Sequence, residues 1–211
     1  PYKDQNVSRT RPDMTIALII INIVVFIWSL TNFENIIAAY GFTPAAATIL
    51  TIFTSMFLHG SIAHIFGNMW FLWIFGDNIE DKFGNVKYIL FYLASGIAAT
   101  FAHYLTDPNS NIPAIGASGA ISGVLGSYLV MFPRARVYVG GFYGGFPIPA
   151  YAMLGFWFVL QLIMGTAGLI GGAASGIAFW AHIVGFVFGA LITWIAMRAG
   201  LLKVGEIQTK K

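Results

Sequence analysis

Apolar stretches recur six times along this chain of 211 residues, and most approach the length that a helix needs to cross a lipid bilayer. They cover residues 14–30, 61–76, 86–105, 116–132, 150–170 and 177–197. Only 9% of the residues are charged, against about 25% in an ordinary soluble domain, so the charge that would cover a water-facing surface is missing. The sequence therefore predicts an all-α membrane protein, a bundle of six transmembrane helices.

One membrane domain is expected over residues 1–211, with a segment at 1–13, a six-helix core at 14–197 and a tail at 198–211. Of the 11 Lys and Arg residues, ten precede the first stretch, follow the last, or lie between stretches two and three or four and five, and Lys87 is the second residue of stretch three. In a six-helix bundle these places share one side, so the positive-inside rule puts both termini in the cytoplasm. The first stretch follows basic residues, as a signal peptide does, but no small-residue cleavage site follows it, and we expect it to be a helix.

The three predicted outer loops differ in character. Loop 31–60 is long and apolar, and we expect it to lie partly in the bilayer interface. Loop 106–115 is short and polar, and loop 171–176, "GGAASG", has the small residues of a flexible lid. The second and fourth stretches are short, which is typical of helices that begin inside the membrane beside a cavity.

Glycines at a spacing of four mark two of the predicted helices. Gly119 and Gly123 lie in the fourth stretch, and Gly185 and Gly189 lie in the sixth. Small residues at this spacing let membrane helices approach closely, so we expect the fourth and sixth helices to pack backbone to backbone.

A few polar residues stand in these apolar stretches. His182 is the one residue of "AFWAHIVGFVFGAL" (178–191) that is neither apolar nor glycine, and an imidazole in hydrocarbon points to a functional site. Ser118 opens the fourth helix within "GASG", and His64 and Asn68 share one face at the start of the second helix within "HGSIAHIFGN". All three helices enter from the outer side, so these four residues are expected at one depth.

The four residue types suit acyl transfer. Histidine is the usual base that takes the proton of a serine nucleophile, and His182 can serve Ser118 in this way. An oxyanion needs hydrogen-bond donors, which the helix start at Ser118 and the side chains of His64 and Asn68 can supply. The acidic residues of the predicted outer half lie in loops, so the sequence favours a Ser–His dyad whose imidazole is held by packing.

"GASG" (116–119), "HGSIAHIFGN" (59–68) and "AHIVG" (181–185) resemble the three motifs of rhomboid intramembrane serine proteases, and the resemblance spans essentially the whole chain. It implies Ser118 as nucleophile and His182 as general base. It implies an oxyanion site made of His64, Asn68 and the Ser118 backbone N–H. Gly116, Ala117 and Gly119 would shape the turn at the nucleophile, and His59 and Gly185 would give structural support.

The resemblance also implies the setting of the reaction. Substrates would be single-pass transmembrane proteins cut near the outer face, in the plasma or inner membrane of a prokaryote. The fifth helix and the last outer loop would control entry from the lipid bilayer. No metal or cofactor would be used, and the basic residues form no cluster that suits nucleic acid.

Two positions depart from well-known bacterial rhomboids. Their first outer loop carries a Trp-Arg pair, which the matching "ATILTIFTS" lacks, so this loop must be held in another way. A tyrosine that stacks on the catalytic histidine is replaced here by Ser122. We expect another aromatic residue, Phe179 or Trp180, to confine the imidazole.

Other functions fit parts of the pattern. Taken singly, Ser118, His182 and Asn68 suit packing or hydrogen bonds between helices, as do Asn22 and Gln161. His59, His64 and His182 could bind zinc, although the chain lacks H-E-x-x-H. A transporter or a catalytically silent rhomboid-like binder of membrane helices are the remaining alternatives.

Overall fold

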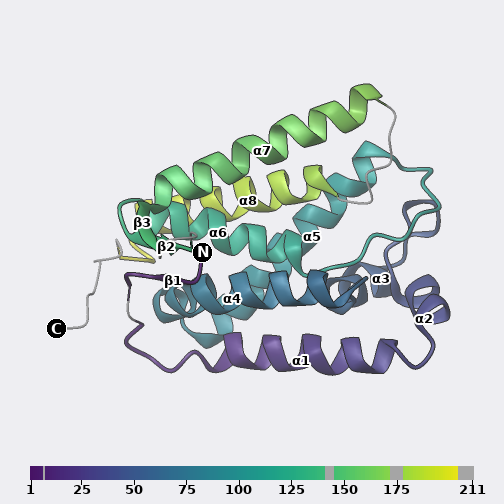
Figure 1. Cartoon of the computed structure of the whole chain (residues 1–211), viewed down its shortest axis with the longest axis horizontal. Helices are drawn as coiled ribbons and strands as arrows, with labels where there is room; N and C mark the ends of the chain where they lie inside the picture. The colour runs from purple at the N-terminus through teal and green to yellow at the C-terminus, as the bar shows by residue number, and fades with distance from the viewer. Residues whose placement is uncertain (7, 141–144, 172–177, 204–211) are drawn as a thin grey trace.

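The computed structural model describes residues 1–6, 8–140, 145–171 and 178–203 (Figure 1). Its long helices are α1 (Asp13–Ser29), α4 (Ile62–Phe83), α5 (Asn85–Thr106), α6 (Ser118–Met131), α7 (Ala150–Gly171) and α8 (Phe179–Arg198). Each overlaps one predicted apolar stretch, and α4 extends beyond the predicted end at residue 76 because its charged last turns continue as helix. The predicted lid falls, apart from Gly171, outside the described residues.

Three described helices are long and apolar enough to cross a membrane alone, namely α5, α7 over Ala150–Gly168, and α8. A fourth candidate combines Ile49–Phe57 with α4 across a bend of 87°. With 17 and 14 residues, α1 and α6 are apolar but shorter. The chain is thus a mostly helical membrane protein with three or four candidate spans among the described residues, fewer than the predicted six.

A small sheet corrects the all-α prediction. Strands β1 (Lys3–Asp4), β2 (Arg136–Val139) and β3 (Phe146–Pro149) pair antiparallel in the order β1-β2-β3. The strands are too short to show a clear alternating pattern, and β1 pairs with a strand far along the chain. Figure 1 shows the sheet at the end of the bundle where α4 and α6 finish and the N-terminus lies.

Helices α6 and α8 pack backbone against backbone, as the glycine spacing predicts. A Cβ atom on Gly189 would lie 2.6 Å from the Cα of Gly123, and one on Gly126 would lie 2.9 Å from the carbonyl carbon of Phe186. Real Cβ contacts essentially never come below 3.0 Å, so these positions admit only glycine without a shift of the helices. Gly119 and Gly123 meet Gly185 and Gly189, and Gly126 meets the backbone of Phe186; we call this contact of α6 with α8 the glycine seam.

A buried carboxyl group fixes α1 against α4. The first backbone N–H groups of a helix have no partner within the helix. Glu80, 1% exposed on α4, accepts from the N–H of Met14 and of Thr15 at 2.8 Å each. The side chain thereby caps α1 across the interface of the two helices.

Loop 31–60, which we predict to be the first outer loop, contains the helices α2 (Phe33–Tyr40) and α3 (Ile49–Thr54) and the 3₁₀ turns Pro44–Ala46 and Ser55–Phe57. Backbone hydrogen bonds hold it in place of the missing Trp-Arg pair. Phe42 and Ala114 form an antiparallel bridge, with N–O distances of 3.0 and 2.8 Å. The Gly116 N–H donates to the Ser55 carbonyl at 2.9 Å, which ties the loop to the turn before Ser118.

Candidate active site

Ser118 and His182 meet where α6 and α8 begin. Ser118 is the first residue of α6, and His182 lies in the first turn of α8. The distance from Ser118 Oγ to His182 Nε2 is 2.7 Å, which is a short hydrogen bond. Because the glycine seam holds the two helix backbones in contact just below, both side chains project from closely spaced positions.

The other imidazole nitrogen of His182 also has a partner. Its Nδ1 lies 3.0 Å from the side-chain oxygen Oε1 of Gln161, which comes from α7. We expect packing rather than an acid to hold the ring, and the amide of Gln161 holds it as well. The assignment of Gln161 as a residue that bridges helices is confirmed. The sequence itself marks Gln161 as a candidate for such a contact, since it is the one amide side chain in the apolar sequence of α7.

His64 borders the same space as Ser118. A Cβ atom on Gly116 would lie 2.8 Å from His64 Nε2 and 3.6 Å from Ser118 Oγ. The Gly60 N–H donates to His64 Nδ1 at 3.4 Å, which leaves Nε2 to carry the proton and face this space. Gly116 has a φ of 129°, so glycine is required here both by backbone conformation and by the imidazole beside it.

Asn68 supplies a second donor next to His64. The side chain is buried at 8% exposure, and its Nδ2 has no hydrogen-bond partner among the described residues. A buried amide N–H without a partner costs free energy, which a bound oxygen atom would recover. The Ser118 N–H belongs to the first turn of α6 and has no partner within the helix. The three predicted oxyanion donors are thus all able to donate.

His59 lies behind His64. Its ring is fully buried and stands edge-on to the His64 ring, with centroids 5.0 Å apart. This position agrees with the predicted supporting role. In the part of the chain that the structure describes, no three His, Asp or Glu side chains group as ligands for one metal ion.

The aromatic residue beside the His182 ring is neither Phe179 nor Trp180, the two that we expect from the sequence. Trp157 of α7 lies with its ring centroid 6.3 Å from that of His182, at an interplanar angle of 32°. Of the two predicted residues, Trp180 instead donates from Nε1 to the Gly165 carbonyl at 3.2 Å. Ser122 donates to the Ser118 carbonyl at 2.6 Å, so it supports the helix turn that carries Ser118.

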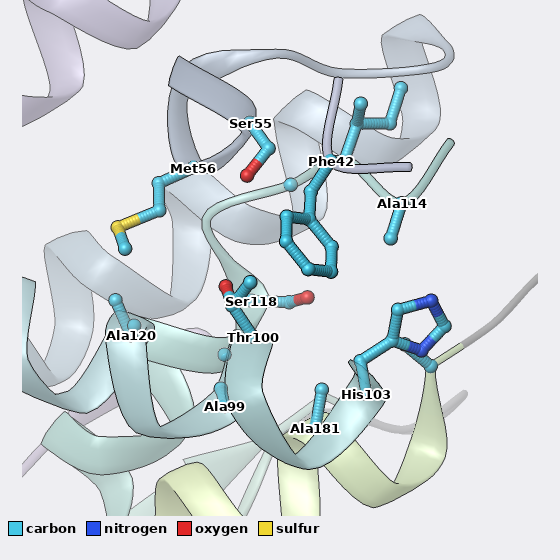
Figure 2. Close-up of a pocket in the computed structure, with 15 residues that line it drawn as sticks. Phe42, Ser55, Met56, Ala99, Thr100, His103, Ala114, Ser118, Ala120 and Ala181 are labelled. Atoms are coloured by element: carbon cyan, nitrogen blue, oxygen red, sulfur yellow. The ribbon is translucent and has the colours of Figure 1, made fainter. Parts of the chain in front are cut away.

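A cavity of about 50 Å³ adjoins Ser118. Its walls include Phe42 and Met56 from the first outer loop and Thr100 from α5. Figure 2 shows the Ser118 side chain beneath the Phe42 ring, with the hydroxyl groups of Ser55 and Thr100 on the same pocket.

The apolar helices and the half-buried Ser118–His182 pair define a helical membrane protein with a serine–histidine site. The family model of the Rhomboid domain matches residues 46–199, and the chain belongs to the rhomboid family.

Curated relatives from bacteria and mitochondria resemble the chain. "Rhomboid protease GluP" of Bacillus subtilis is 32% identical over 162 residues, 73% of this chain and 31% of that protein. "Rhomboid protein 1, mitochondrial" of Saccharomyces cerevisiae is 27% identical over 199 residues, 90% of this chain and 56% of that protein. "Presenilin-associated rhomboid-like protein, mitochondrial" of Homo sapiens is 29% identical over 126 residues, 57% of this chain and 33% of that protein. The chain therefore spans from about a third to just over half of these relatives.

Proposed function

We propose that this chain is an intramembrane serine protease that cleaves single-pass transmembrane proteins. The observation that carries the proposal is the 2.7 Å distance between Ser118 Oγ and His182 Nε2 inside an apolar helix bundle. A serine hydroxyl hydrogen-bonded to an adjacent base is the arrangement of covalent catalysis. The family includes a relative named a protease, which supports the same reading.

The reaction would begin with the attack of Ser118 Oγ on the scissile carbonyl carbon, while His182 Nε2 takes the hydroxyl proton. The C–N bond then breaks, and the leaving amine receives that proton from the imidazolium. A water molecule next gives a proton to Nε2 and attacks the carbonyl carbon of the acyl-enzyme. The bond between that carbon and Ser118 Oγ then breaks, Nε2 returns the proton to Oγ, and the new carboxyl terminus is released. Each step uses the same short Ser118–His182 contact.

The developing negative charge would be bound by donors already in place. His64 Nε2, Asn68 Nδ2 and the Ser118 N–H come from α4 and from the start of α6. Donors fixed before the reaction stabilise a transition state without reorganisation, and loss of one typically costs about 10²–10³-fold in rate. The buried Nδ2 of Asn68, which has no partner among the described residues, suits a donor whose acceptor is the substrate oxygen.

The site lies at the starts of α4, α6 and α8, at the end of the bundle that carries the first outer loop. With six spans and the basic residues on the cytoplasmic side, this end faces outward and substrates would be cut near the outer face. The setting would be the plasma or inner membrane of a prokaryote. A scissile peptide must leave its helical hydrogen bonds to reach Ser118, so segments that unwind easily are favoured.

The test uses purified protein in proteoliposomes with a single-span model substrate. Ser118→Ala and His182→Ala should each abolish cleavage and labelling by a serine-directed fluorophosphonate, while the thermal unfolding temperature stays near that of the wild type. Ser127→Ala is the matched control, because Ser127 is a buried serine farther along α6. Cleavage by Ser118→Ala at the wild-type rate contradicts the proposal. Cleavage that depends on Ser118 but stops with a chelator would point to a metal.

A further inference from the structure

The ring of His182 can work as a base in only one tautomer. To accept the Ser118 proton at Nε2, the neutral imidazole must carry its own proton on Nδ1. A buried N–H group needs an acceptor, and Gln161 Oε1 lies 3.0 Å from Nδ1. The amide oxygen thus meets the ring at the one atom that decides which tautomer forms.

We propose that Gln161 is a positioning residue that selects the catalytic tautomer and orientation of His182, in place of the carboxylate of a triad. This inference rests on the proposed function. The Nδ1–H donates to Oε1 both before and after Nε2 takes the serine proton. The amide dipole therefore favours the imidazolium that forms in the reaction.

A neutral acceptor suits this location better than an acid does. The apolar sequence of α7 carries Gln161 near its middle, and an ionised carboxylate at such a depth costs several kcal/mol in general. Among the described residues, no carboxylate bonds to His182, whose ring nitrogens are hydrogen-bonded to Gln161 and Ser118. An amide supplies the acceptor oxygen without a buried charge.

The rest of α7 holds Gln161 in place. Trp157, Gln161 and Gly165 are spaced by four residues and share one helix face. Trp157 lies beside the imidazole, and the Gly165 carbonyl accepts from Trp180 Nε1 at 3.2 Å. A Cβ atom on Gly165 would lie 3.2 Å from the Cβ of Phe179, so a small residue brings α7 close to the start of α8. This face sets the rotation of α7 that aims Gln161 at Nδ1.

Gln161→Leu removes the acceptor and keeps a side chain of similar size. We expect kcat to fall about tenfold, the equivalent of about 1.4 kcal/mol, with KM unchanged. The rate of fluorophosphonate labelling of Ser118 should fall by the same factor, because labelling needs no transmembrane substrate. Gln161→Glu keeps an oxygen at the same position, and the apolar surroundings favour its neutral form, which accepts from Nδ1–H without a buried charge. This variant should restore both rates to within about threefold of the wild type. A purely structural role predicts neither the unchanged KM nor this rescue.

Thr166→Val is the control, since Thr166 is an exposed polar residue on the same helix. Thermal unfolding is measured for every variant, and Gln161→Met replaces Gln161→Leu in all readouts if the leucine variant does not fold. A folded variant without the acceptor whose kcat and labelling rate stay within twofold of the wild type overturns the inference. Wild-type protein that fails to label, or Ser118→Ala that still cleaves, instead overturns the proposed function.

Discussion

Gly189→Ala tests whether the glycine seam sets the geometry of the site. The added Cβ would lie 2.6 Å from the Cα of Gly123 and closer still to its carbonyl oxygen. Carbon atoms pack at about 3.5–4.0 Å, so α8 must move from α6 by roughly 1 Å. Such overpacking typically costs about 1–3 kcal/mol of stability.

The same movement would reach the site along α8. Added to the 2.7 Å between Ser118 Oγ and His182 Nε2, a shift of roughly 1 Å takes the pair beyond hydrogen-bond distance. A misplacement of this size can cost about 10²-fold in rate. We therefore expect Gly189→Ala to lose about 10²-fold in cleavage and fluorophosphonate labelling, although Gly189 contacts neither reacting residue.

Gly155→Ala is the matched control. An added Cβ there meets nothing within 4 Å, and alanine in a helix is about 0.5–1 kcal/mol more favourable than glycine. The two variants share the intrinsic helix effect and differ in the contact with α6. Cleavage rate and thermal unfolding are compared in the same proteoliposomes. If Gly189→Ala cleaves within twofold of the wild type and unfolds no earlier than Gly155→Ala, the reasoning about the seam is refuted.

Three further changes probe other parts of the molecule. Gly116→Ala places a Cβ 2.8 Å from His64 Nε2 at a φ of 129°, and should cost about 1–3 kcal/mol and slow fluorophosphonate labelling at least about tenfold, as a gel assay would show. Glu80→Gln weakens the cap on Met14 and Thr15 and should lower the free energy of unfolding by about 2 kcal/mol in a denaturant titration; an unchanged value would mean that the cap contributes nothing. Burial raises the pKa of Asp4 from 3.8 to about 6. Because this pKa is higher in the folded state, the contribution of the Asp4 carboxyl group to the free energy of unfolding is complete below pH 3.8 and is lost as the pH rises through 6. Asp4→Asn should therefore flatten the fall in unfolding temperature between pH 4 and pH 7, and a fall as steep as that of the wild type would contradict this account.

The sequence predicts well those features that depend on one helix at a time. Apolar length marks each helix, and the spacing of Gly119, Gly123, Gly185 and Gly189 predicts which two helices touch. The depth of Ser118 and His182 follows from the place of each residue in its own stretch. The two side chains can meet if both helices begin on the same side of the membrane.

Features that depend on the rotation of a helix are beyond this reasoning. An almost wholly apolar helix such as α7 shows no polar face, because lipid and bundle interior are both apolar. Nothing in the pattern therefore says that Trp157 and Gln161 face His182, while Trp180 faces Gly165. The pairing of β1 with β2 is missed for a different reason, since two short strands carry little periodicity.

Helix α7 is attached to the bundle on one side only. It packs mainly against α8, and residues such as Phe156 and Ile163 remain exposed to the surroundings at 67% and 57%. Acyl-chain length changes the tilt of a helix that is free to adjust, whereas two helices joined through their backbones move as one body. Because α7 carries Gln161 and Trp157 beside the imidazole, we expect a change in the thickness of the host membrane to shift these two side chains relative to His182, even when no substrate is present.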